Sequence, residues 1–166
     1  MFYIIISIVI IQRLVELVIS KKNEKTLRSE GAIEFGKEHY KFLVILHILF
    51  FISMLVEYNF RESSYELNTI NYLFLLFFCI LQLLRLWVLK TLGKFWNTRI
   101  LRTPGSQLIK AGPYKYFKHP NYIIVVCEIF TIPMIFNLYF TAIVFTILNA
   151  VILSIRISTE NNVLKN

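Results

Sequence analysis

Five long apolar blocks constrain the fold of this chain more than any other feature of its sequence. They cover approximately residues 2–20, 42–58, 68–90, 121–136 and 138–156, and most approach the roughly 20 residues that a transmembrane helix needs. Of the 166 residues, 57% are hydrophobic and 17% are charged. A soluble domain of this length has too little interior to bury so much apolar surface. We therefore predict an all-α fold: a single integral membrane domain over residues 1–166, a bundle of about five transmembrane helices.

The first block does not have the pattern of a cleaved signal peptide. It lacks a basic start, it contains Arg13 and Glu16, and no small-residue cleavage site follows it. We expect this block to remain in the protein as its first span.

The charges between the blocks predict the orientation in the membrane. Residues 21–41 hold six Lys or Arg and residues 90–118 hold seven, whereas residues 59–67 hold only Arg61. The positive-inside rule places both basic loops in the cytoplasm, with the N-terminus outside and the C-terminus inside. The net charge of +8 is better explained by topology and by anionic lipid than by nucleic acid, so no nucleic-acid partner is expected.

An aromatic and cationic run, residues 112–122 (GPYKYFKHPNY), stands at the edge of the fourth block. Pro120 is expected to begin the helix, because proline is tolerated in the first helical turn. His119 then lies just outside the helix, beside unpaired backbone amides that favour an anionic group. Alternatively, the lysines and tyrosines of the run are only an interfacial belt that anchors the helix, and residue types do not decide between these readings.

Further polar residues lie within or at the ends of the blocks. Arg156 and Glu160 share a helix face, where the alternative to a functional role is a snorkelled arginine with a weak ion pair. Glu128 is expected to face the bundle, either protonated or paired with Arg85 or Arg13, because a charged residue facing lipid is costly. His47 is interpreted as a hydrogen-bonded core histidine. No Cys or His spacing is typical of a metal site, so no metal is predicted.

Several of these motifs together resemble the isoprenylcysteine carboxyl methyltransferase family, membrane enzymes that use S-adenosylmethionine. The resemblance lies in Gly112-Pro113-Tyr114, in Lys118-His119-Pro120-Asn121-Tyr122, and in the distant Arg156 and Glu160. The bacterial branch of the family is resembled further upstream, at residues 12–17, 31–34, 38–40, 85–87 and 92–99. That branch includes small enzymes thought to O-methylate alkylpyrones, so the resemblance implies the bacterial cytoplasmic membrane, with the active site on the cytoplasmic side.

The resemblance also implies which residues form the site. Arg156 matches the arginine on the substrate side and is the predicted catalytic residue. The implied cofactor-binding residues, for S-adenosyl-L-methionine, are Arg99, Ser106, Gln107, Leu108, Ile109, Tyr114, His119, Pro120, Asn121, Tyr122 and Glu160. Lys115 and Lys118 stand where relatives usually have arginine, which keeps the charge but loses the bidentate geometry.

The resulting hypothesis is methyl transfer to the carboxylate or enolic oxygen of a lipophilic acceptor that enters from the bilayer, either isoprenylcysteine-like or alkylpyrone-like. A first alternative is an NADPH-dependent membrane reductase related to sterol reductases, with Lys110, Lys115 and Lys118 as a phosphate-binding cluster. A second is a non-enzymatic membrane scaffold or carrier. A third, within the same chemistry, is a phospholipid N-methyltransferase. The oligomeric state is left open.

Overall fold

The computed structural model describes residues 1–61, 67–106 and 109–165 of the chain. Within these ranges the elements are α1 (Phe2–Ser29), β1 (Ile33–Phe35), α2 (Lys37–Asn59), α3 (Thr69–Leu92), the 3₁₀ helix η1 (Gly93–Phe95), β2 (Ile100–Arg102), the 3₁₀ helix η2 (Gly112–Lys115), α4 (Pro120–Ile135) and α5 (Tyr139–Lys165). An α-helix covers each of the five apolar blocks, so the predicted all-α membrane architecture is confirmed.

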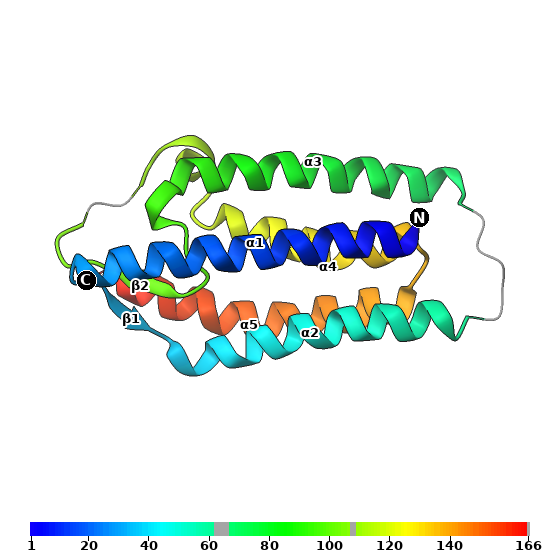
Figure 1. Ribbon diagram of the computed structural model, residues 1–166, viewed down its shortest axis with the longest axis horizontal. Coiled ribbons are helices and arrows are strands. Elements are labelled where there is room, and N and C mark those ends of the chain that lie inside the picture. Colours follow the sequence, from blue (N-terminus) through cyan, green and yellow to red (C-terminus); the bar gives the residue numbers. More distant parts are fainter. Residues whose placement is uncertain (62–66, 107–108, 166) are drawn as a thin grey trace.

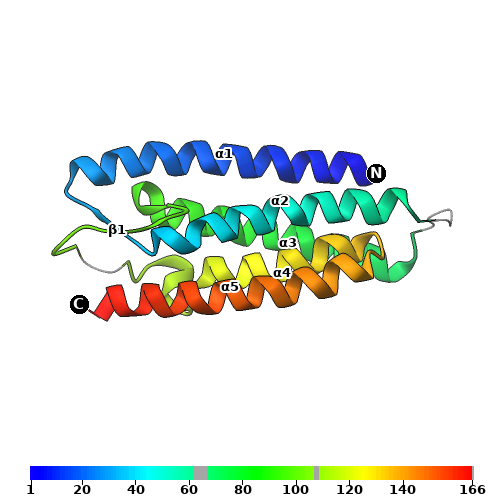
Figure 2. The ribbon, with the colours of Figure 1, turned by 90° about the horizontal axis from the view of Figure 1, so that it is seen from below.

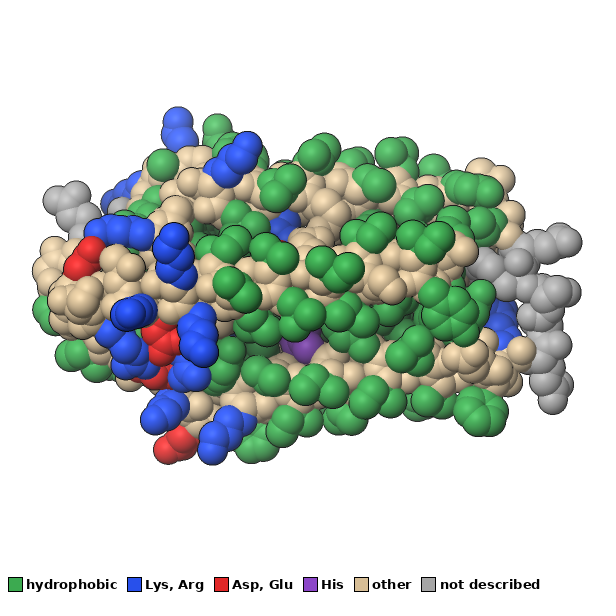
Figure 3. Space-filling view, viewed as in Figure 1, with side chains coloured by type: hydrophobic (Ala, Val, Ile, Leu, Met, Phe, Trp, Pro, Cys, Tyr) green, Lys and Arg blue, Asp and Glu red, His purple; other side chains and the backbone are tan. Residues whose placement is uncertain are grey.

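The surface of the bundle is that of an integral membrane protein. By length and composition, α1, α2, α3 extended by η1, and α5 can each cross a membrane. Large apolar side chains such as Val18, Leu83 and Phe140 are exposed on these helices, and Figure 3 shows apolar side chains over the middle and charged ones gathered at one end. Helix α4 has 16 residues, or about 24 Å at 1.5 Å per residue, so it is shorter than the hydrocarbon core of about 30 Å.

Helix α4 is the most enclosed helix of the bundle. It packs between α3 and α5, and α5 in turn packs against α2. Nine of its residues are buried, among them Pro120, Glu128 and Pro133. Figure 2 shows α1 on the side of the bundle opposite α4 and α5.

At the end of the bundle where the N-terminus lies, aromatic rings and asparagines connect the ends of the helices. Phe2 stacks on Tyr58 with ring centroids 3.8 Å apart and meets Phe136 edge-on at 4.9 Å. Asn137 adopts a left-handed φ of 52° in the α4–α5 turn, a conformation that asparagine tolerates better than most residues. Its side-chain oxygen accepts a 2.7 Å hydrogen bond from Asn71 of α3.

The other end of the bundle carries the predicted site segments. The ends of α1, α3 and α5 and the starts of α2 and α4 meet there, far from the N-terminus (Figure 1). Residues 112–122 and the end of α5 therefore share one end of the molecule, as expected. An antiparallel ribbon pairs Glu34 of β1 with Leu101 of β2 and links the loops after α1 and α3. The sequence analysis did not predict this ribbon.

Four charged side chains form a balanced cluster inside the bundle, which we call the intramembrane charge cluster: Arg13, Glu16, Arg85 and Glu128. Glu128 of α4 accepts hydrogen bonds from Arg85 Nε at 2.9 Å and from Arg13 Nη2 at 2.5 Å. Arg85 also contacts Glu16 at 3.1 Å. The prediction that Glu128 faces the bundle and pairs with Arg85 or Arg13 is confirmed for both arginines. The pairing compensates buried charge and joins α1 to α3 and α4.

Candidate active site

A cavity of about 1060 Å³ extends from the ribbon end of the bundle into the slot between α1 and α2. It brings together nine of the predicted site residues: Arg99, Ser106, Ile109, Tyr114, His119, Asn121, Tyr122, Arg156 and Glu160. Pro120 is buried and does not line the cavity. Gln107 and Leu108 lie outside the described residues.

The Tyr122 hydroxyl connects the cation and the acid on the cavity wall. It accepts a 2.9 Å hydrogen bond from Arg156 Nε and donates a short one to Glu160. Arg156, only 8% exposed, also donates through Nη2 to the backbone carbonyl of Thr98 at 2.5 Å. Arg156 is therefore held in one orientation by α4 and by the loop before β2.

His119 lies where the sequence places it, as the N-cap of α4 with non-helical φ and ψ of −131° and 62°. Its Nδ1 is 3.7 Å from a carboxylate oxygen of Glu160, and its Nε2 is 3.1 Å from Oδ1 of Asn161. Its ring stacks on Tyr122 at a centroid distance of 5.4 Å. The histidine and the acid, 41 positions apart in the sequence, thus face each other across the cavity mouth.

Pro120 and Asn121 have different roles at the start of α4. Pro120 occupies the first helical position, which needs no N–H donor. Asn121 lines the cavity, and its buried Oδ1 has no hydrogen-bond partner in the described part of the chain. An unpaired buried amide oxygen is a ready acceptor for a ligand N–H or O–H group.

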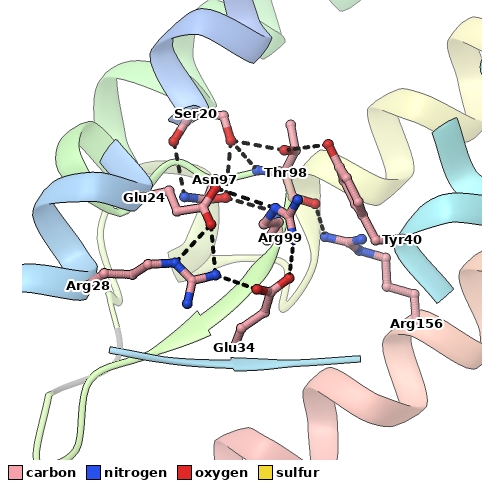
Figure 4. A network of polar contacts seen from close by, with 9 residues as sticks. All are labelled: Ser20, Glu24, Arg28, Glu34, Tyr40, Asn97, Thr98, Arg99 and Arg156. Carbon is pink, nitrogen blue, oxygen red and sulfur yellow. Dashed lines mark hydrogen bonds and ion pairs between the residues drawn. The ribbon is translucent and has the colours of Figure 1, made fainter. Parts of the chain in front are cut away.

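Arg99 belongs to a polar network beneath the ribbon (Figure 4). It forms an ion pair with Glu34 and a weaker one with Glu24 at 3.4 Å, and its guanidinium lies 4.6 Å from the centre of the Tyr40 ring. Burial alone would raise the pKa of Glu34, but hydrogen bonds from Arg99 and Arg28 hold it below its usual value. The same bond to Glu34 raises the pKa of Arg99.

The connecting loop and η2 supply the remaining predicted residues. Ser106 donates to the Thr103 carbonyl at 2.7 Å, so its hydroxyl is engaged by its own loop. Tyr114 of η2 is half-buried against the cavity. Burial and the charge of Glu160 raise the pKa of the Tyr114 phenol, which keeps it protonated and able to donate.

Sequence reasoning missed several groups that shape the site. The Thr98 carbonyl, the Tyr40 ring and the Glu34 carboxylate all contact predicted site residues. Their segments carried the resemblance to the bacterial branch, and that was the available signal. Arg13 and His47 also line the cavity, although the sequence suggested only structural roles for them.

The cavity has a charged outer part and an apolar inner part. Its outer part presents a carboxylate, an imidazole and a guanidinium, whereas the slot between α1 and α2 is lined by side chains such as Leu14, Phe51 and Leu55. Such a site can hold a charged soluble ligand at one end and a lipid chain at the other.

Comparisons with known proteins identify the family of this chain. The family model for isoprenylcysteine carboxyl methyltransferase matches residues 73–166. An uncharacterized Bacillus subtilis protein, YpbQ, is 42% identical over 168 residues, covering 99% of this chain and 97% of its own. An uncharacterized Haemophilus influenzae protein is 29% identical over 155 residues, covering 93% and 89%. No solved structure matches the chain. With its charged cavity mouth, its apolar slot and a family match over more than half its length, the chain belongs to the isoprenylcysteine carboxyl methyltransferase family of membrane proteins.

Proposed function

We propose that this protein is an S-adenosylmethionine-dependent methyltransferase that acts on the carboxylate or enolic oxygen of a lipophilic, membrane-resident acceptor. The observation that carries the proposal is a single cavity joining His119, Glu160 and Arg156 to the apolar slot between α1 and α2. Its volume of about 1060 Å³ is slightly above the roughly 300–1,000 Å³ of small-molecule sites. This is room for a donor and part of an acceptor together.

The charged and polar groups at the cavity mouth fit S-adenosylmethionine, the methyl donor. Glu160 suits the ammonium group of the cofactor, while His119 and the backbone N–H of Asn121 at the start of α4 suit its carboxylate. Glu160 and His119 lie 3.7 Å apart, so both side chains border the same space, where a zwitterionic amino-acid group would bind. The cofactor supplies a methyl group on a positively charged sulfur.

The protein's own residues align the reactants and exclude water. Arg156 holds the anionic oxygen of the acceptor, and the Tyr122 ring, 5.7 Å from the Arg156 guanidinium, favours a nearby cation through its π face. A carboxylate or acidic enol is ionised near neutral pH, so no general base is needed. Alignment of two bound reactants contributes about 7–11 kcal/mol in favourable cases.

The acceptor and its route follow from the slot. A hydrocarbon tail lies between α1 and α2, with its anionic head at Arg156, so the acceptor reaches the site from the bilayer. The positive-inside rule supports a position of this end, with its basic loops, at the cytoplasmic face of a bacterial membrane, where the soluble cofactor is available. Membrane lipids surround the remaining surface.

One observation favours the NADPH-dependent alternative enough to test it. Lys110, Lys115 and Lys118 all line the cavity and together suit phosphate groups. We expect isothermal titration of the purified protein in nanodiscs to show binding of S-adenosylmethionine and not of NADPH. The reverse preference overturns the proposal.

The reaction itself is tested by incubating the protein with labelled S-adenosylmethionine and a lipid extract of its own cells. Mass spectrometry is expected to find the label on the oxygen of a lipid acid or enol, and a label on nitrogen contradicts the acceptor class. If the protein is a non-enzymatic scaffold, no lipid is labelled. Heat-denatured protein is the control.

A further inference from the structure

The deep part of the cavity carries polar side chains that the proposed methyl transfer does not use. Residues of α1 and α2 line the slot at helical spacing, so each helix presents one face. Beyond Tyr40 toward the middle of the membrane, the described lining residues of these two helices are apolar except for Arg13, Glu16 and His47. A pure hydrocarbon chain in this slot would leave polar atoms unpaired, which is costly in a buried site.

His47 presents a hydrogen-bond acceptor to the slot. Its Nδ1 lies 2.8 Å from the carbonyl oxygen of Leu43, and because a carbonyl only accepts, Nδ1 carries the proton. No carboxylate contacts His47 in the described ranges, and an unpaired imidazolium at this depth is disfavoured. The ring is therefore neutral, and Nε2 keeps a lone pair that no described residue of the protein uses.

Arg13 presents hydrogen-bond donors to the same space. It donates through Nη1 to Glu16 at 3.0 Å and through Nη2 to Glu128 at 2.5 Å. A guanidinium has five N–H groups, so three remain, including that on Nε. Its side chain lines the cavity and is 20% exposed, and the two carboxylates fix its position.

Two helices independently give the depth of this polar pair. On α2, His47 follows Tyr40 by seven residues, which is a rise of about 10 Å along the helix. On α4, Glu128 follows Tyr122 by six residues, a rise of about 9 Å. Because Glu128 binds Arg13, it gives the depth of the Arg13 guanidinium. The Tyr40 hydroxyl lies 3.3 Å from Oγ1 of Thr98, whose carbonyl binds Arg156. The polar pair therefore lies about 10 Å deeper than the site that holds the acceptor's anionic oxygen.

We propose that the acceptor is a lipid acid or enol whose chain carries a hydroxyl group about 10 Å from the anionic oxygen. A hydroxyl donates to Nε2 of His47 and accepts from Arg13 at the same time. A carbonyl satisfies only Arg13, and a thioether or a plain methylene satisfies neither. The inference rests on the proposed function, since Arg156 sets the position of the anionic oxygen.

The test compares three C18 fatty acids as probes, because about 10 Å corresponds to roughly eight carbon–carbon bonds of an extended chain, at about 1.25 Å of chain length per bond, which reaches the middle of such a chain. The affinities of 10-hydroxystearate, 2-hydroxystearate and stearate are measured by competition for the protein in phosphatidylcholine nanodiscs. We expect 10-hydroxystearate to bind about tenfold more tightly than the other two, the gain from one well-placed buried hydrogen bond. Equal affinities, or an equal gain from the 2-hydroxyl group, overturn the proposal without any variant.

Variants then assign the preference to His47. His47→Leu replaces the ring with a side chain of similar size and is expected to abolish the preference for 10-hydroxystearate. His39→Leu is the matched control, because His39 lies on the same helix but does not line the cavity, and the preference is expected to persist. A preference that survives in His47→Leu contradicts the assignment.

The same samples separate this inference from the proposed function. If the protein binds S-adenosylmethionine but does not distinguish the three lipids, the methyltransferase proposal stands and the hydroxyl site is refuted. If the protein prefers 10-hydroxystearate but does not bind S-adenosylmethionine, the hydroxyl site stands and the methyl-transfer reaction is refuted.

Discussion

The hydroxyl of Tyr122 donates a hydrogen bond to the carboxylate of Glu160 and thereby joins the start of α4 to the end of α5. Arg156 and Glu160 share a helix face, yet no ion pair connects them directly within the described residues. Arg156 instead binds the other side of the same hydroxyl. The phenol therefore separates the Arg156 guanidinium from the Glu160 carboxylate, and the proposed function assigns the first to the acceptor and the second to the cofactor.

Removal of this hydroxyl tests the arrangement. Tyr122→Phe keeps the ring that stacks on His119 but removes one hydrogen bond to Arg156 and one to Glu160. Since hydrogen bonds to charged groups contribute about 1.5–3 kcal/mol, we expect kcat/KM to fall at least tenfold in protein that remains folded. Tyr139→Phe is the control, because that ring is 53% exposed and does not line the cavity. An unchanged kcat/KM in Tyr122→Phe excludes a role for the hydroxyl.

Arg156 is expected to serve the acceptor and not the cofactor. Arg156→Lys keeps the charge but loses the fork that contacts both Thr98 and Tyr122. We expect kcat/KM for the acceptor to fall roughly 10- to 100-fold, since charged hydrogen bonds of about 1.5–3 kcal/mol are lost. The dissociation constant for S-adenosylmethionine, measured by calorimetry, should change less than about threefold. A large loss of cofactor affinity would contradict this assignment and indicate that Arg156 binds the cofactor.

Glu160 is expected to show the opposite pattern. Glu160→Gln keeps the shape of the side chain but removes the charge that faces His119 at 3.7 Å. The dissociation constant for S-adenosylmethionine should rise about tenfold or more, as a charge-assisted contact becomes a neutral one. Lipid binding, measured by the same competition assay, should be unaffected. Normal cofactor affinity in this variant refutes the assignment.

The sequence predicted the helices well because their physical signal is local. Apolar blocks of membrane-spanning length leave little choice but helix, and Pro120 begins α4 as its chemistry requires. The partners of Glu128 were also predictable, because a carboxylate inside a membrane needs a cation and few are available at that depth.

Other features depend on contacts between distant segments. The β1–β2 ribbon consists of only three residues per strand, too few to show a period in the sequence. The backbone carbonyl of Thr98 carries no sequence signal as a partner of Arg156. His47 was interpreted as a core residue because its position on the cavity wall depends on how α1 stands beside α2.

The intramembrane charge cluster is expected to be the main polar contribution to stability. Glu128→Ala leaves Arg85, which is only 1% exposed, without its closest carboxylate. Breaking a buried pair in this way costs about 3–5 kcal/mol, and we expect a correspondingly large loss in the free energy of unfolding in mixed micelles titrated with sodium dodecyl sulfate. Glu30→Ala, which removes an ion pair to Lys94 on the exposed surface, is the control and should cost about 0–1 kcal/mol. Equal losses in the two variants would contradict a structural role for the cluster.

The ion pairs of Glu34 in the β1–β2 ribbon should make the stability of the protein sensitive to acid. Because the pKa of Glu34 is lower in the folded protein than in the unfolded chain, its ion pairs with Arg99 and Arg28 stabilise the fold fully above the unfolded pKa of about 4.3. This stabilisation is lost as the pH falls through the folded pKa, since the unfolded chain binds the proton first. We expect the melting temperature to decline as the pH falls below the unfolded pKa of Glu34, and to decline less in Glu34→Gln, which has no charge to lose. Lys94→Gln, which removes the cation of an exposed pair and leaves Glu34 intact, should keep the wild-type profile, and parallel curves for Glu34→Gln and the wild type would contradict the assignment.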